Sequence, residues 1–164
     1  MSPKKINLKK YKDSRGYLIE ILPKKFKKKF VYSILTNSKK NVVRGLHYDS
    51  RLEEEKLIYL LDGKILDVCV NLKKGKNFGK ITYKTLKKGD GLYIPKGFAH
   101  GYKCLQKKNI IIYFLTKFFD YKTNKGIIWN DKKLKIKWPK KKLIISNKDK
   151  KNLTFDEYLK IIKK

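Results

Sequence analysis

Histidine and arginine are rare in this chain, and one residue of each type lies in the same short run. The sequence has only two histidines, and three arginines among its 44 lysines and arginines. Arg44 and His47 lie in Val-Val-Arg-Gly-Leu-His-Tyr, residues 42–48. An imidazole exchanges protons near neutral pH, and a guanidinium binds phosphate through paired hydrogen bonds. The run predicts a strand that carries a proton-transfer group, and strand alternation predicts that Arg44 faces away from His47.

The second histidine, His100, ends a turn of the sequence Ile-Pro-Lys-Gly-Phe-Ala-His-Gly, residues 94–101. Glycine and proline there indicate a tight turn that leads into a new strand. A single histidine in a strand is more often a core residue than a catalyst, but two histidines with the same glycine-rich surroundings favour a site. They form no His-x-His pair, and a metal centre would need further soft or imidazole ligands. We therefore expect no bound metal.

The composition indicates one folded domain, spanning residues 1–164. With 41% hydrophobic and 13% aromatic residues, the chain can bury a sizeable core. No apolar run approaches the roughly 18 residues of a membrane helix, and no apolar signal segment follows the basic N-terminus, so we expect a cytoplasmic protein without membrane contact. Cys69 and Cys104 lie in apolar stretches without a CxxC spacing, which predicts free, buried thiols.

The formal net charge of +30 could indicate a nucleic-acid-binding protein. The lysines, however, occur in pairs and triplets in nearly every loop and not in one cluster. We therefore expect a general lysine bias and no nucleic-acid partner. The charge would still attract a small anionic substrate.

Short apolar runs between turn residues predict an all-β protein, either a sandwich or a barrel. The expected strands cover residues 17–22, 30–36, 41–48, 56–61, 64–72, 79–86, 91–94, 101–105 and 109–116. Thr154 and Glu157 form a capping-box pattern that predicts a helix over about residues 154–162. An Asp-Gly pair at 62–63 predicts a hairpin whose register puts Lys56 and Asp67 on one face. Two alternatives stay open for that face: a used or paired set of charges, or an outward edge with an extended lysine.

Many motifs, in order, resemble the dTDP-4-dehydrorhamnose 3,5-epimerase family of sugar-nucleotide cupins over about residues 11–150. The motifs lie at residues 13–20, 43–48, 56–58, 65–70, 94–101, 129–131, 136–139 and 146–149. The resemblance implies an all-β cupin, a double-stranded β-helix jelly roll with a short C-terminal helix. It also implies a nucleotide-sugar substrate, no cofactor and a homodimer.

A family of this kind removes and returns protons beside a C4 ketone, which needs a base, an enolate stabiliser and an acid. By resemblance, His47 is the base and Asp149 the carboxylate that orients it. Lys56 stabilises the enolate oxygen, and Tyr113 returns the proton. From its strand context alone, Tyr113 could equally be a core tyrosine.

The resemblance also assigns the substrate-binding residues. These are His100 paired with Asp67 in the sugar pocket, Phe119 against the base, and Arg15, Glu20, Arg44 and Lys148 around the diphosphate, with Arg15 and Glu20 reaching a partner's site. Arg51 is expected to be a solvated charge.

The chain departs from the family pattern at Tyr32, Ile34, Phe119 and Asn124, which weakens the case for dTDP and for epimerisation at both carbons. The alternatives are a 3-only epimerase, an epimerase of a different nucleotide sugar, and a non-catalytic cupin that binds a sugar nucleotide or a polyanion.

Overall fold

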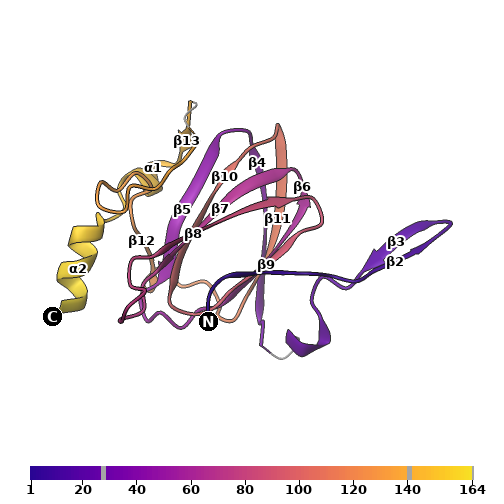
Figure 1. Ribbon diagram of the computed structural model, residues 1–164, viewed down its shortest axis with the longest axis horizontal. Helices are drawn as coiled ribbons and strands as arrows, with labels where there is room; N and C mark the ends of the chain where they lie inside the picture. The colour runs from indigo at the N-terminus through magenta and orange to yellow at the C-terminus, as the bar shows by residue number, and fades with distance from the viewer. Residues whose placement is uncertain (27–28, 140–141, 164) are drawn as a thin grey trace.

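Two β-sheets face one another in the computed structural model, which describes residues 1–26, 29–139 and 142–163 (Figure 1). The first sheet contains, in spatial order, β1 (Lys4–Ile6), β9 (Gly91–Ile94), β6 (Lys56–Asp62), β11 (Lys108–Leu115) and β4 (Tyr32–Lys39). The second contains β12 (Asn124–Gly126), β5 (Val42–Asp49), β10 (Phe98–Cys104), β7 (Lys64–Asn71) and β8 (Ile81–Lys87), with β13 (Ile144–Ile145) added parallel to β5.

The remaining elements are short. A separate hairpin of β2 (Lys10–Asp13) and β3 (Gly16–Ile19) stands away from the two sheets, on the side opposite the C-terminal helix (Figure 1). The helices are the 3-10 turn η1 (Lys24–Phe26), α1 (Asn147–Lys150) and α2 (Phe155–Lys163). Among the described residues, no helix has the length and apolar character needed to cross a membrane.

Alternation along the strands builds the core. Inward side chains of both sheets meet in one cluster, which includes Ile58, Leu60, Ile65, Leu92 and Ile111. The outer face of the second sheet carries another apolar row, and Phe155 and Tyr158 of α2 cover that row together with Trp138. Both cysteines are free and buried, as predicted.

The predicted all-β class is confirmed, and each of the nine expected strands has a counterpart within a few residues of its predicted bounds. The capping box is confirmed as well: Thr154 donates its backbone N–H to Glu157 Oε2 at 2.7 Å, and Glu157 donates its own to Thr154 Oγ1 at 3.2 Å. Four strands and α1 were not expected. β2 has no apolar alternation because every residue in it is exposed, and α1 spans only four residues.

The predicted hairpin between β6 and β7 is wrong. β6 pairs with β9 and β11, whereas β7 pairs with β10 and β8, so the Asp-Gly turn passes from one sheet to the other. Gly63 has the positive φ of 94° that such a turn requires. The local turn signal was read correctly, but each strand is buried and takes its partners from distant parts of the sequence.

Candidate active site

A pocket of about 200 Å³ opens between the two sheets. Its lining residues are Ile34, Thr36, Arg44, His47, Glu54, Lys56, His100, Gly101, Tyr102, Tyr113, Leu115, Phe119, Asn124 and Lys148. Seven of the eleven predicted site residues therefore line one cavity. Two more, Asp67 and Asp149, hydrogen-bond to histidines that line the cavity.

A bulge in β5 brings Arg44 and His47 to the same side of the sheet, contrary to the prediction from simple alternation. His47 pairs with His100 and Arg44 with Tyr102, so two residues of β5 stand opposite the single residue Gly101 of β10. The extra residue shifts the alternation by one position. A Cβ on Gly45 would lie 2.6 Å from the His100 carbonyl oxygen, so the bulge requires glycine there.

His47 and Asp149 form a hydrogen-bonded pair, with 2.6 Å between Nε2 and Oδ1. β13 pairs with the start of β5 and leads into α1, where the Oγ of the N-cap residue Ser146 accepts the Asp149 N–H at 3.0 Å. This turn carries the Asp149 carboxylate behind His47, where it also accepts the Gly45 N–H at 3.3 Å.

Burial alone would raise the pKa of Asp149, but the hydrogen bonds from His47, Gly45 and Ser146 outweigh burial and hold that pKa below its ordinary value. Asp149 is therefore ionised at neutral pH and can only accept hydrogen bonds. His47 donates its Nε2 hydrogen to Asp149, and in the neutral imidazole this tautomer places the lone pair on Nδ1. A neutral imidazole held in this way is suited to act as a general base.

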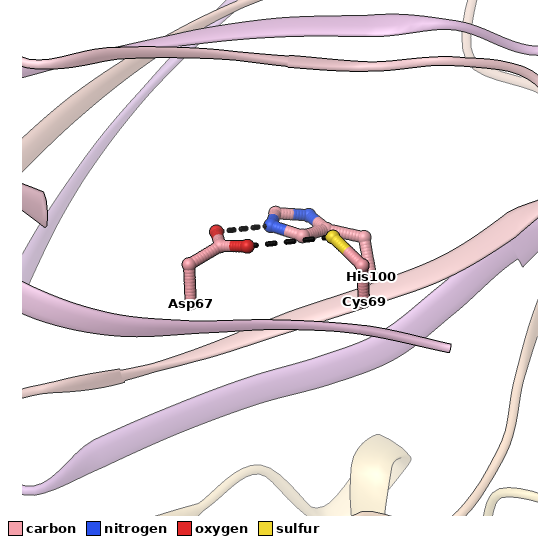
Figure 2. Close-up of side chains that lie close together, drawn as sticks. All are labelled: Asp67, Cys69 and His100. Carbon is pink, nitrogen blue, oxygen red and sulfur yellow. Dashed lines mark hydrogen bonds and ion pairs between the residues drawn. The ribbon is translucent and has the colours of Figure 1, made fainter. Parts of the chain in front are cut away.

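A second histidine–carboxylate pair is buried deeper. His100 Nε2 lies 2.6 Å from Asp67 Oδ2, and the Cys69 thiol donates to Asp67 Oδ1 at 3.4 Å. Figure 2 shows the three side chains turned toward one another from β7 and β10.

The same three side chains have donor atoms within 4.8 Å of one another, and they form the one such group among the described residues that could hold a metal ion. Nitrogen, sulfur and oxygen donors suit a borderline cation such as Zn²⁺. Burial and Asp67, however, raise the pKa of the Cys69 thiol well above its ordinary value, which disfavours the thiolate that a metal binds. The mutual hydrogen bonds account for all three groups, and the absence of a metal stays a prediction.

Lys56 and Tyr113 approach the pocket from neighbouring strands of the first sheet. Lys56 Nζ lies 3.1 Å from Glu54 Oε1, and both side chains are nearly buried. Burial and the nearby Tyr102 and Asp67 raise the pKa of the Tyr113 phenol well above its ordinary value. Tyr113 therefore stays protonated and can donate a proton.

Aromatic rings and a cation lie at the edge of the pocket. Phe119 is 39% exposed, and its ring packs edge to face against Tyr121 with 4.7 Å between centroids. Lys148 Nζ lies 5.8 Å from the Phe119 ring centroid. Exposed, paired rings with an adjacent cation are suited to hold a planar base and a phosphate.

The structure does not bring Arg15 and Glu20 to this pocket within one chain. Arg15 lies in the turn of the β2–β3 hairpin, where its side chain is 88% exposed and its guanidinium bonds Asp13 at 2.7 Å. Glu20 follows the same hairpin and is exposed. Arg51 is exposed, as expected. Tyr32 does not line the pocket, and its ring packs against Phe118 instead.

Sequence reasoning missed Thr36, Glu54 and Tyr102 as pocket residues. Each lies two positions from a residue that was singled out: Ile34, Lys56 and His100, respectively. Because side chains two apart on a strand share a face, period-two spacing was the signal that could have found Thr36 on β4 and Tyr102 on β10, whereas Glu54 lies just before β6. The pocket as a whole combines a base, a buried acid and several cations, which is what moving a proton next to a carbonyl requires.

Comparisons with known proteins identify the family of this chain. The family model described as dTDP-4-dehydrorhamnose 3,5-epimerase matches residues 3–157. Among characterised relatives, the dTDP-4-dehydrorhamnose 3,5-epimerase of Escherichia coli K12 is 35% identical over 137 residues, 80% of this chain and 74% of that protein. That of Neisseria gonorrhoeae is 34% identical over 138 residues, which span 79% of this chain and 42% of the longer relative.

The solved structures give the same result at the level of the fold. The epimerase of Legionella pneumophila, solved with dTDP-4-keto-L-rhamnose, superposes with a TM-score of 0.86 at 31% identity, over 94% of this chain and 88% of that one. The dTDP-4-dehydrorhamnose 3,5-epimerase of Bacillus anthracis, solved with TDP and pyrophosphate, gives a TM-score of 0.86 at 31% identity over 93% of each chain. The chain is thus a cupin-type isomerase that belongs to the dTDP-4-dehydrorhamnose 3,5-epimerase family.

Proposed function

We propose that this protein is a cytoplasmic, cofactor-independent epimerase that inverts C3, C5 or both in a 4-keto-6-deoxyhexose linked to a nucleoside diphosphate. The observation that carries the proposal is the meeting of His47, Lys56 and Tyr113 in one pocket, with Asp149 hydrogen-bonded to His47. Such an enzyme would serve deoxysugar synthesis for surface polysaccharide.

In the proposed reaction, Nδ1 of His47 takes the proton from a carbon beside the ketone. The C–H electrons form the carbon–carbon double bond of an enolate, and the carbonyl electrons move onto the oxygen. The Lys56 ammonium stabilises that oxygen, and Tyr113 gives its phenolic proton to the opposite face of the carbon. Solvent then reprotonates the phenolate, and the imidazolium loses its proton.

The substrate class follows from the remaining lining groups. Arg44 and Lys148 are cations that suit a diphosphate, and Phe119 with Tyr121 suits a stacked base. His100, held by Asp67, would contact the sugar. Relatives solved with dTDP-4-keto-L-rhamnose and with TDP support a thymidine nucleotide. Ile34 and Asn124, two departures from the family pattern, line the pocket. Nucleotides with other bases and a 3-only reaction are therefore tested together with the thymidine nucleotide.

We propose that the working unit is a homodimer in which the β2–β3 hairpin carries Arg15 and Glu20 to the partner's pocket. The support is the hairpin itself, which stands away from its own sheets and exposes Tyr17 and Leu18 at 58% and 62%. Apolar side chains on a projecting hairpin favour burial against a second subunit.

NMR in deuterated water tests the reaction. We expect wild-type protein to replace the C3 or C5 hydrogen of dTDP-4-keto-6-deoxyglucose by deuterium, and His47→Ala to abolish the exchange. Loss of one signal alone would identify a 3-only or 5-only enzyme. Full exchange in the His47→Ala variant would overturn His47 as the base. No exchange in the wild type with any nucleotide tried would overturn the proposed reaction and favour a non-catalytic sugar-nucleotide cupin.

A further inference from the structure

Glu54 is an acid inside a pocket whose other charged groups are cations. Within the described lining it is the only carboxylate, and it shares the pocket with Arg44, Lys56 and Lys148. Glu54 lies two positions before Lys56, in the segment that leads into β6, and both side chains line the pocket. Lys56 Nζ and Glu54 Oε1 are 3.1 Å apart, and the two side chains are 10% and 12% exposed.

Among the described residues, the carboxylate of Glu54 forms one ion pair, with Lys56. Its Oε1 atom is buried and accepts no hydrogen bond from the described residues, so the nearby ammonium is what offsets its desolvation. Because the pair is nearly buried, salt screens it weakly. Glu54 thus weakens the attraction of Lys56 for the phosphates of an approaching anion, while the ammonium remains available to an oxygen in direct contact with it.

The other two cations, Arg44 and Lys148, contact neutral groups. Arg44 bonds the neutral Ser38 hydroxyl at 3.1 Å, and Lys148 lies over the Phe119 ring. Neither forms an ion pair within the described part of the chain. The pocket therefore has one paired cation at Lys56 and two unpaired ones elsewhere.

We propose that Glu54 screens Lys56 from the phosphates of the substrate and so determines which end of the substrate lies against Lys56. The inference rests on the proposed function and deepens it. A diphosphate gains most at the unpaired Arg44 and Lys148. The ammonium of Lys56 still has N–H groups free for a ketone oxygen, which needs a donor but carries no charge. The neutral end of the substrate is thereby directed to Lys56, and the charged end away from it.

Calorimetric titration of inorganic pyrophosphate at low ionic strength tests the proposal with four proteins: wild type, Glu54→Gln, Lys56→Gln and the double variant. We expect Glu54→Gln to bind pyrophosphate at least about threefold more tightly, because an unscreened cation is added to the site. The double variant should return to about the wild-type affinity, because the neutral pair is removed as a unit. Unchanged or weaker binding by Glu54→Gln would overturn the proposal, as would a double variant that binds as tightly as Glu54→Gln.

Glu55→Gln is the matched control. Glu55 carries the same charge one position along but contacts Lys29 and accepts the Tyr93 hydroxyl at 2.6 Å, away from the pocket. Its replacement should leave pyrophosphate affinity unchanged. If Glu54→Gln does not fold, Glu54→Asp provides the same test, because a shorter side chain withdraws the carboxylate from Lys56 and should tighten binding to a smaller extent.

Turnover gives a second measurement. Substrate held backwards at an unscreened Lys56 is unproductive, so Glu54→Gln should lower kcat and KM by the same factor. Pyrophosphate binding needs no turnover, so the titrations remain decisive for Glu54 even if the wild type exchanges no substrate hydrogen. In that case the proposed function fails, and the pyrophosphate affinities alone decide whether Glu54 screens Lys56.

Discussion

At the scale of single residues, the proposed chemistry depends on keeping a base and an acid in different protonation states within one pocket. Asp149 is ionised because hydrogen bonds lower its pKa, and its carboxylate orients the His47 ring. Tyr113 is protonated because burial raises its pKa. His47 as the base and Tyr113 as the acid can therefore perform opposite proton transfers at the same pH.

This division predicts the behaviour of Tyr113→Phe. The variant should still let His47 remove and return the substrate proton, so deuterium enters without inversion. The inverted product should fall by about 10²–10⁴-fold, the usual contribution of a general acid. NMR of the recovered sugar distinguishes retained from inverted deuterated product.

Tyr102→Phe is the control for that substitution. Tyr102 lines the same pocket, and its hydroxyl lies 3.2 Å from Thr36 Oγ1 and raises the pKa of Tyr113, so its loss should alter the acid but cost less product than loss of the Tyr113 phenol itself. Inverted product formed at the wild-type rate by Tyr113→Phe would show that another group is the acid.

At the same scale, the sequence predicted which residue types meet but not every contact between them. His47, Lys56 and Tyr113 could be placed because family motifs mark them. Glu54 and Tyr102 carry no such mark, and their roles appear only when the strands are assembled. Cys69 was expected to be a buried thiol, but its hydrogen bond to Asp67 depends on strand geometry.

At the scale of elements, the decisive feature is the bulge that turns Arg44 and His47 to one side. Nine strands could be predicted from apolar periodicity, because alternation is local. The bulge could not, since it arises from the pairing of β5 with β10, which is distant in sequence. For the same reason the Asp-Gly turn at 62–63 predicted a hairpin where the chain instead changes sheets.

The bulge makes Gly45→Ala a severe substitution. Gly45 has φ of 107°, and a Cβ would lie 2.6 Å from the His100 carbonyl oxygen and 2.7 Å from Gly101 Cα. Backbone strain and overpacking should together lower the free energy of unfolding by about 3 kcal/mol or more. Activity should fall as well, because His47 lies on the same strand. Urea unfolding followed by tryptophan fluorescence measures the first effect.

Gly75→Ala separates the two contributions. Gly75 has a similar φ of 120°, but a Cβ there would meet nothing within 4 Å. Gly75→Ala should therefore lower the free energy of unfolding by the backbone strain alone, about 1–2 kcal/mol, and leave activity unchanged. Equal destabilisation by both substitutions would mean that β10 yields to the added methyl group.

At the scale of the whole molecule, the net charge of +30 is spread over the surface, while the pocket separates paired from unpaired cations. The surface charge can speed the arrival of an anionic substrate, but it cannot orient that substrate. In our proposal, orientation depends on Arg44 of β5, Lys148 of α1 and the pair of Lys56 at the start of β6 with Glu54 just before it. Of the predicted site residues, Arg15 and Glu20 are the two that a single chain does not bring to the pocket.

Mixing two inactive variants tests whether a second copy completes the site. Arg15→Ala and His47→Ala homodimers should each be inactive or nearly so. In a hybrid dimer, the subunit that keeps His47 receives Arg15 from its partner, so one of the two pockets is intact. After equal mixing, random exchange makes half of the dimers hybrid and restores about a quarter of the wild-type activity.

His47→Ala mixed with Lys56→Gln should restore nothing, because both residues belong to the same pocket of one chain. Sedimentation at the monomer mass of 19.5 kDa, or no recovery in hybrids shown to form, would contradict a shared site.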